Sequence, residues 1–288
     1  MSRQPLGQHF LADDYWREEI ARAIRVSPPS DMAVAESRQQ ADFCWMEIGP
    51  GHGEMTEYLV GTGAPVHVIE VDQFLIGNLN RLKKKNPNLD VICGDILETD
   101  LAAVAKGRRM RIYGSLPYYI TSPILHHLFR FAALIEEIHV VVQSEVAERM
   151  AAEPGSKAYG YLSVATQLHS RPELVLEIPR AAFTPPPEVG STLVTLRLPG
   201  GWEELRRGGL LLGEDESAQQ KVESEEDFLG FVKLCFSKKR KTLVNNLREV
   251  AEPDEVRKAL GPVGLRPDAR AEQISISNFG ALYAALRK

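Results

Sequence analysis

The chain is poor in cysteine, and its three cysteines are badly placed for a shared task. Cys44, Cys93 and Cys235 lie far apart in a chain of 288 residues. An odd number of widely spaced cysteines argues against a disulfide framework and against a CxxC metal-binding knuckle. We therefore expect reduced, mostly buried cysteines and no bound metal.

Long apolar runs are also missing. No stretch of the sequence approaches the ~20 consecutive apolar residues that a membrane-spanning helix needs, and the mean hydropathy is -0.20. The first eleven residues contain neither the apolar core of an export signal nor an Arg-rich amphipathic stretch. These features predict a cytoplasmic protein with no membrane partner.

Basic residues are not in excess either. The chain has 34 Lys and Arg against 39 Asp and Glu, for a formal net charge of -5. Such a chain has no general positive field for nucleic acid, so any binding of that kind depends on local clusters. One cluster follows the acidic stretch Glu214–Asp227 and consists of Lys238, Lys239, Arg240 and Lys241. By itself, this basic run also fits a solvated helix face.

What the chain does have is enough length and apolar content for a large core. At 288 residues, with 44% hydrophobic and 25% charged residues, it can form one large or two ordinary domains. From Phe43 to Leu198, short apolar or β-branched runs alternate with amphipathic stretches of helical length. This alternation is typical of an α/β fold in which helices cover a parallel sheet.

The elements predicted between these bounds are as follows. Strands are expected at Phe43–Ile48, Val66–Val71, Asp90–Cys93, Arg111–Gly114 and Ile138–Val142. Helices are expected at Met55–Val60, Phe74–Lys84, Ser122–Ala132, Glu145–Ala152 and Tyr159–Ser170. The runs Leu174–Ile178 and Thr192–Leu198 resemble the antiparallel strands that often close such a sheet at its edge.

A second, smaller domain is predicted after a glycine-rich linker at Pro199–Gly213. Helical spacing without any strand pattern appears at Phe228–Glu249, Asp254–Leu260 and Asn278–Leu286. The predicted division is therefore an α/β domain over residues 1–199 and an all-helical domain over residues 200–288.

A glycine-rich turn follows the first predicted strand. Gly49, Gly51 and Gly53 alternate with other residues before a helix, so the backbone can approach a ligand closely. Glu70 ends the second strand about 20 residues later, where a carboxylate can accept hydrogen bonds from both hydroxyls of a ribose. Asp95 follows the third strand and is suited to an exocyclic adenine amine. The set predicts an adenosine-bearing ligand, although each acidic residue alone also fits a helix cap.

The spacing of the glycines separates two classes of cofactor. A dinucleotide enzyme normally has GxGxxG, whereas this loop has glycine at every second position. Together with Glu70 and Asp95, the loop resembles that of the class I S-adenosylmethionine-dependent methyltransferases.

A second motif follows the fourth predicted strand. Ser115, Leu116, Pro117 and Tyr118 resemble the Asn-Leu-Pro-Tyr tetrad of amino-methyltransferases that act on adenine. In those enzymes, the first side chain and a main-chain carbonyl hold the N6 amine while the aromatic ring stacks on the base. Ser115 stands where that family has Asn or Asp, and its shorter hydroxyl is expected to orient the amine less well.

Further segments in the same order extend the resemblance to one family, the bacterial KsgA-type ribosomal RNA adenine N6,N6-dimethyltransferases. They are Leu6–Asp13, Glu47–Thr56, Val142–Arg149, Pro154–Gly160, Ala182–Ser191, Lys239–Leu247 and Arg266–Phe279. Gly190 replaces the Asp that is usual in the family. The resemblance covers nearly the whole chain and implies a Rossmann-like class I methyltransferase domain with a small helical domain.

The resemblance also implies roles for individual residues. Cofactor contacts are implied at His9, Leu11, Gly49, Gly51, Glu70, Asp95 and Ser115. Tyr118 and Phe183 are implied to sandwich a flipped adenine, and the basic run Lys238–Lys241 is implied to face RNA.

The expected activity is therefore transfer of methyl groups from S-adenosylmethionine to N6 of two adjacent adenines near the 3′ end of small-subunit rRNA. The expected partner is an immature small ribosomal subunit, on which the protein acts as a monomer during ribosome biogenesis. Two alternatives stay open. One is an Erm-like methyltransferase of large-subunit rRNA, and the other is an assembly factor with weak or no catalysis, suggested by Ser115.

Overall fold

The computed structural model describes residues 9–26, 42–117, 119–199, 225–238 and 240–286. The chain forms two compact units. The first comprises Met1–Ala147 and Pro172–Leu198, and the second comprises Glu148–Arg171 and Pro199–Lys288. Among the described residues, no helix has both the length and the apolar character needed to cross a membrane.

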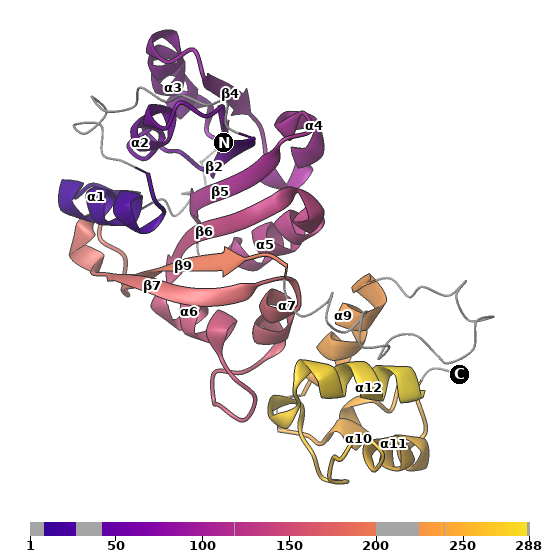
Figure 1. Cartoon of the computed structure of the whole chain (residues 1–288). Helices are drawn as coiled ribbons and strands as arrows, with labels where there is room; N and C mark the ends of the chain where they lie inside the picture. The colour runs from indigo at the N-terminus through magenta and orange to yellow at the C-terminus, as the bar shows by residue number, and fades with distance from the viewer. Residues whose placement is uncertain (1–8, 27–41, 118, 200–224, 239, 287–288) are drawn as a thin grey trace, which may run out of the picture. The chain divides into compact units, whose positions relative to one another are not determined.

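The first unit is built on a seven-stranded sheet (Figure 1). Its strands, in spatial order, are β4 (Leu89–Cys93), β3 (Val66–Glu70), β2 (Phe43–Ile48), β5 (Arg109–Ser115), β6 (Ile135–Gln143), β9 (Ser191–Arg197) and β7 (Arg171–Ile178). The strands from β4 to β6 are parallel to one another, and β9 is antiparallel to β6. The sequence prediction of a parallel sheet with an antiparallel edge is confirmed.

The central strands are apolar because helices cover both of their faces. Every residue of β3 is buried, and so is every residue of β2 after Phe43. The helices of this unit are α1 (Asp14–Ala23), α2 (Thr56–Gly61), α3 (Gln73–Lys85), α4 (Leu101–Ala105), α5 (Thr121–Phe129) and the start of α6 (Ser144–Ala151). Asp13, Asp72 and Asp100 cap α1, α3 and α4, because each side chain accepts a hydrogen bond from a backbone N–H two residues on.

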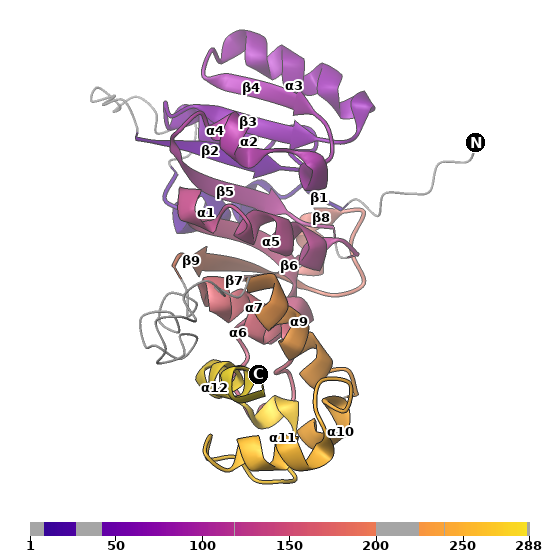
Figure 2. The same cartoon turned by 90° about the vertical axis from the view of Figure 1, so that its right-hand side faces the viewer.

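A separate two-stranded sheet brings distant parts of the chain together. β1 (Phe10–Leu11) pairs in antiparallel fashion with β8 (Phe183–Thr184), with Leu11 opposite Phe183. Figure 2 shows the two strands side by side. The sequence did not predict this pair, because strands of two residues are too short to show a periodic pattern.

Strand β6 begins at Ile135, three residues earlier than predicted, and therefore includes the charged pair Glu136-Glu137. Both carboxylates have basic partners on neighbouring strands: Arg111 Nε donates to Glu136 at 3.0 Å, and Arg197 pairs with Glu137. His139, Arg197 and Arg111 lower the pKa of Glu137 to about 2, although partial burial acts in the opposite direction. The strand can therefore continue through charged residues because their charges are compensated.

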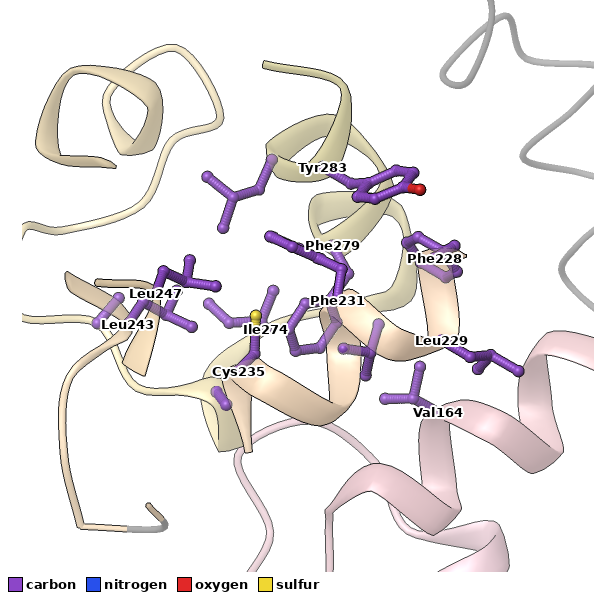
Figure 3. Close-up of a cluster of buried hydrophobic side chains, with 14 of the residues drawn as sticks. Val164, Phe228, Leu229, Phe231, Cys235, Leu243, Leu247, Ile274, Phe279 and Tyr283 are labelled. Carbon is purple, nitrogen blue, oxygen red and sulfur yellow. The ribbon is translucent and has the colours of Figure 1, made fainter. Parts of the chain in front are cut away.

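The second unit has an aromatic core formed by α7 (Tyr161–His169), α9 (Glu225–Cys235), α10 (Leu243–Asn246), α11 (Pro253–Leu260) and α12 (Ile276–Leu286). Figure 3 shows Val164 of α7 with the aromatic side chains of α9 and α12. The rings of Phe228 and Phe231 lie 5.4 and 5.2 Å from that of Tyr283. Such ring pairs add stability beyond the burial of their area.

The boundary between the two units differs from the predicted boundary at residue 199. Residues 148–171 precede it in the sequence but pack with the helices of the second unit. Val164 and Leu168 of α7 are fully buried in the core of the second unit. The Tyr159 hydroxyl donates to the Ile274 carbonyl at 2.8 Å, and the Gly155 N–H donates to the Glu272 carbonyl at 2.7 Å. This segment lies within the α/β part of the sequence, and its pattern alone does not show where it packs.

The helical spacing over Phe228–Glu249 corresponds to two helices and not to one continuous helix. Helix α9 ends at Cys235, and α10 begins only at Leu243. The Asn246 side-chain amide donates to the Cys235 carbonyl at 2.6 Å and to the Lys238 carbonyl at 3.3 Å, which satisfies carbonyls at the end of α9. Lys238, Arg240 and Lys241 therefore lie in a turn between two helices, not on a helix face, and Lys239 lies outside the described residues.

Candidate active site

The candidate site lies at the carboxyl ends of the central parallel strands. Strand β2 is paired with β3 on one side and with β5 on the other, so the chain runs outward from β2 in both directions. Open α/β sheets bind ligands at such a switch point, beyond the carboxyl ends of the strands. A pocket opens there between the loop after β2, the end of β3 and the end of β5.

The glycine loop forms one wall of this pocket. Gly49 and Gly51 have φ values of +64° and +61°, which favour glycine over residues with a side chain. A Cβ atom on Gly51 would lie 3.0 Å from the Phe10 ring, so the lack of a side chain also allows β1 to approach. The loop therefore presents bare backbone to the pocket, as the sequence predicted.

Glu70 joins the glycine loop to the end of β3. Its Oε2 accepts the Gly51 N–H at 3.3 Å, and its Oε1 accepts the Asp72 N–H at 2.8 Å. Burial raises the pKa of Glu70, and these two backbone donors act against that rise. A carboxylate offers about four acceptor positions, so the side chain that lines the pocket can still accept hydrogen bonds from a ligand.

The Ser115-Leu116-Pro117 segment forms the opposite wall, at the end of β5. The Leu116 N–H donates to the Val141 carbonyl at 3.0 Å, which fixes the segment against β6. The Pro117 carbonyl already accepts from the Ile120 N–H and the Thr121 hydroxyl. The Leu116 carbonyl is therefore the better candidate for holding a ligand amine beside Ser115. Tyr118 lies outside the described residues.

The β1–β8 pair supplies the third side of the pocket. His9, Leu11 and Phe183 all line it, and Phe183 is only 3% exposed. The His9 ring lies 2.7 Å from the Pro185 carbonyl, measured from Nδ1, which ties the start of β1 to the segment after β8. Residues from both ends of the α/β sequence thus meet over the carboxyl edge of the sheet.

The pocket also contains a buried carboxyl group that the sequence prediction did not assign. Glu47 lies on β2, is 2% exposed and accepts the Thr56 hydroxyl at 2.5 Å. Burial raises its pKa to about 8, and the charges of Glu54 and Glu70 act in the same direction. Tyr113 is opposite Glu47 in the β2–β5 register, and burial raises its pKa as well.

Charge indicates which ligands this pocket fits. Glu47, Glu54 and Glu70 all line it, and no described lining residue is Lys or Arg. Acidic side chains without a neighbouring cation oppose a pyrophosphate and suit a ligand that carries positive charge. Burial keeps Glu47 protonated in the free protein, so Glu54 and Glu70 carry most of this effect. The charge of the pocket therefore favours a cationic ligand over a dinucleotide.

Two predicted groups are not among the described residues that line the pocket. Asp95 follows β4, where the Gly94 N–H donates to the Glu70 carbonyl at 3.0 Å, yet Asp95 is not among the described residues that line the pocket. Its Oδ1 instead accepts the Leu97 N–H at 2.9 Å and caps a short helix (Ile96–Glu98). The basic run belongs to the second unit, whose placement relative to the pocket is not determined.

Residues that the sequence reasoning missed fall into two kinds. Glu47 could have been found, because it is the one charged residue in the buried run Phe43–Ile48. Burial of a carboxyl group is costly unless it is hydrogen-bonded or paired, so such a residue indicates a specific role. Tyr119 and Ser191 also line the pocket, but neither stands out by residue type or spacing. Tyr119 is 67% exposed and places an aromatic ring at the mouth of the pocket.

The sheet order and the position of the pocket are those of a Rossmann-like fold of the kind found in class I methyltransferases. Two solved structures share this fold over nearly the whole chain. A dimethyladenosine transferase from Plasmodium falciparum has a TM-score of 0.68 at 22% identity and covers 95% of this chain and 96% of its own. The 23S rRNA methyltransferase ErmE has a TM-score of 0.63 at 24% identity and covers 96% of this chain and 99% of its own.

Sequence comparisons identify the family. The ribosomal RNA adenine dimethylase model matches residues 1–200, so the chain belongs to that family. A ribosomal RNA small subunit methyltransferase A from Acidobacterium capsulatum is 41% identical over 243 residues, covering 84% of this chain and 80% of its own. One of the same name from Koribacter versatilis is 36% identical and covers 98% of this chain and 94% of its own. The family resemblance inferred from the motifs is confirmed.

Proposed function

We propose that this protein transfers methyl groups from S-adenosylmethionine to N6 of two adjacent adenines near the 3′ end of small-subunit rRNA. The proposed substrate is an immature small ribosomal subunit in the cytoplasm, and the protein acts on it as a monomer. The observation that carries the proposal is the acidic, glycine-walled pocket, which opens beside Ser115 and Leu116. When bound, S-adenosylmethionine supplies a methyl group on a cationic sulfur.

Different residues around the pocket are proposed to hold different parts of the cofactor. Glu70 is proposed to hold the ribose hydroxyls, and the bare backbone of Gly49 and Gly51 to accommodate the methionine part. Glu47 is buried in β2 and offers a carboxyl group that becomes ionised more readily beside a cation. His9 and Leu11 are proposed to cover the cofactor from the β1 side. Asp95 is proposed to accept a hydrogen bond from the adenine amine, because its capping bond to the Leu97 N–H uses only one acceptor position of the carboxylate.

The target base is proposed to enter between the Ser115 segment and Phe183. An adenine inside a duplex cannot present N6 to the pocket, so the base has to be flipped out. Phe183 and Tyr118 are proposed to stack on its two faces, while the Ser115 hydroxyl and the Leu116 carbonyl accept the two amine hydrogens. This arrangement aims the nitrogen lone pair at the methyl group without a strong base, and the surplus proton leaves after transfer.

The basic turn is proposed to add affinity for RNA. Lys238, Arg240 and Lys241 lie in the turn between α9 and α10, and the sequence places Lys239 with them. Lys and Arg side chains bind phosphates without reading sequence, so this surface would hold the rRNA while the pocket selects the base.

Ser115 favours one other candidate function. If the shorter side chain cannot orient the amine, the protein binds cofactor and subunit precursors without methylating them, as an assembly factor. An Erm-like activity on large-subunit rRNA has weaker support, because the two relatives with 41% and 36% identity bear a small-subunit name.

The test is transfer of labelled methyl from S-adenosylmethionine to unmethylated small subunits, followed by nuclease mapping of the product. We expect dimethyladenosine at two adjacent positions near the 3′ end of the rRNA. Glu70→Ala and Tyr118→Ala serve as controls that should abolish transfer. Binding of cofactor and subunits without transfer would replace this proposal with the assembly-factor function, and methylation of large subunits alone would replace it with the Erm-like activity.

A further inference from the structure

The first unit carries a cluster of basic side chains at the edge of the sheet opposite the pocket. Lys83, Lys84 and Lys85 form the last turn of α3, which leads into the start of β4. Lys106, Arg108 and Arg109 lie between α4 and the start of β5. Because β4 and β5 are parallel strands, both groups lie at the amino edge of the sheet.

Asp90 and His67 lie near both groups, one through a contact and the other through charge. Lys83 Nζ donates to Asp90 Oδ1 at 2.7 Å, and the other oxygen of Asp90 lies 3.8 Å from His67 Nδ1. Burial lowers the pKa of His67, Asp90 acts against this, and the charges of Lys106 and Arg108 lower it further. His67 on β3 is thus within electrostatic reach of basic residues from both groups.

The cluster is positive within an acidic protein. Its six basic residues are Lys83, Lys84, Lys85, Lys106, Arg108 and Arg109, and the acidic residues in the same half of the edge, at the starts of β2 and β4, are Asp42 and Asp90. The whole chain has 34 basic and 39 acidic residues. Without the six basic and two acidic residues of the cluster, 28 basic and 37 acidic residues remain. The cluster therefore has a net charge of about +4, while the remainder has about -9.

Pairing within the protein does not neutralise this charge. Among the described residues, Lys83 has a carboxylate partner, whereas Lys84, Lys85 and Lys106 have none within ion-pair distance. The other half of the same edge behaves differently, because Arg111 pairs with Glu136 and Arg197 pairs with Glu137. Lysines in the last turn of α3 interact favourably with the negative end of the helix dipole, which can explain their position. Lys106 and Arg108 follow α4 and not α3, so the dipole of α3 does not explain them.

We infer that this basic edge is a second phosphate-binding surface that contacts the RNA backbone at a distance from the target adenines. The inference rests on the proposed rRNA substrate and extends it. Strand β5 separates Arg109 from Ser115 by six residues, or roughly 20 Å at ~3.3 Å a residue. An RNA that fills only the pocket cannot span this distance, so the edge selects for a large, folded RNA such as an assembled subunit.

The test compares two variants on two substrates. Lys84→Gln, Lys85→Gln and Lys106→Gln are combined in one protein, and the same three positions are changed to Arg in a matched control that keeps the charge. All three residues are exposed, and none belongs to the pocket. The substrates are unmethylated small subunits and a short RNA hairpin that carries the two adenines.

With small subunits, we expect the glutamine variant to bind about tenfold or more weakly than wild type at moderate salt. The slope of log K against log salt should fall by about 2, since each lost phosphate contact removes roughly 0.7 to 0.9. The arginine variant should bind like wild type, and both variants should methylate the hairpin at the wild-type rate. An unchanged slope and affinity for subunits in the glutamine variant would overturn the inference.

Failure of the proposed activity would look different. If wild type methylates neither substrate, the proposed function is wrong, but direct binding of the three proteins to subunits still reports on the basic edge. If wild type methylates subunits and the glutamine variant is indistinguishable from it, the activity stands and the basic edge has no role in RNA binding.

Discussion

The Gly51 N–H and the Glu70 carboxylate are joined by a hydrogen bond of 3.3 Å, which connects the ligand-facing loop after β2 to the end of β3. The same carboxylate accepts the Asp72 N–H at 2.8 Å. Glu70 therefore has two tasks. It holds the glycine loop in place, and it faces the pocket in which we propose that a ribose binds.

Glu70→Gln should weaken binding of S-adenosylmethionine by about 10 to 100-fold. The amide loses the negative charge and half of the acceptor capacity, and a hydrogen bond to a charged group is worth about 1.5 to 3 kcal/mol. Isothermal titration with S-adenosylmethionine measures the change. Glu57→Gln, an exposed carboxyl group on α2, is the matched control and should bind like wild type. Equal affinities in the two variants would remove Glu70 from the proposed site.

Ser115→Asn should raise the rate of methyl transfer to small subunits without a large change in cofactor affinity. The longer amide can reach the amine directly, and better orientation of a reacting group lowers the barrier. Single-turnover transfer measures the rate, and Ser115→Ala should be slower than wild type. If the asparagine variant and wild type transfer at the same rate, Ser115 does not slow catalysis. The assembly-factor alternative then has no supporting observation.

The pH dependence of stability should report on Glu47. Its folded-state pKa of about 8 lies above the usual value of 4.5, so between these values the folded state holds a proton that the unfolded state has released. Stability of the free protein should therefore fall as pH rises from about 5 to 8, by on the order of a few kcal/mol. Urea unfolding of wild type and Glu47→Gln across this range provides the measurement. The variant should show a flatter profile, and parallel profiles would contradict the assignment.

Asn246 should be important for the stability of the second unit. Asn246→Ala removes the donor to the Cys235 and Lys238 carbonyls, and unsatisfied buried groups of this kind cost about 1 to 3 kcal/mol. Denaturant unfolding measures the loss. Asn245→Ala, whose amide donates only to the Thr242 hydroxyl, should cost less. Equal losses for the two variants would show that Asn246 does not hold the turn.

Neutralising the basic turn should weaken RNA binding in a salt-dependent way. Lys238→Gln, Arg240→Gln and Lys241→Gln together should lower the slope of log K against log salt by about 2 for small subunits. The exposed pair Arg257→Gln and Lys258→Gln on α11 of the same unit is the control and should leave the slope unchanged. An equal change in both variants would indicate a general charge effect and remove the turn from the RNA-binding surface.

The sheet could be predicted from the sequence because its central strands are buried on both faces. Runs such as Phe43–Ile48 and Val66–Glu70 are apolar for that reason, and turns and helices separate them clearly. Pairing could not be predicted for β1 and β8, which are held by partners far away in sequence and not by a pattern of their own. Likewise, the break after Cys235 depends on the Asn246 side chain, a contact that helical periodicity does not reveal.

Only part of the candidate site could be predicted from the sequence. Glycine spacing and the position of Glu70 follow from local rules for turns and strand ends, so they can be recognised in a single sequence. Glu47 was overlooked because it precedes the glycines of the motif and its role depends on burial. For Asp95 the sequence left open a helix cap beside the ligand contact, and the structure shows the cap.

The β1–β8 pair also sets the order in which the protein can mature during its own synthesis. His9 and Pro185, which meet beside the pocket, are 176 positions apart. The glycine loop and its neighbouring strands can form as the chain emerges, but the pocket stays open on the β1 side until residue 185 has left the ribosome. Closing so long a loop is entropically costly and comes late in folding. A nascent chain therefore lacks a finished pocket until nearly all of the α/β part has been made.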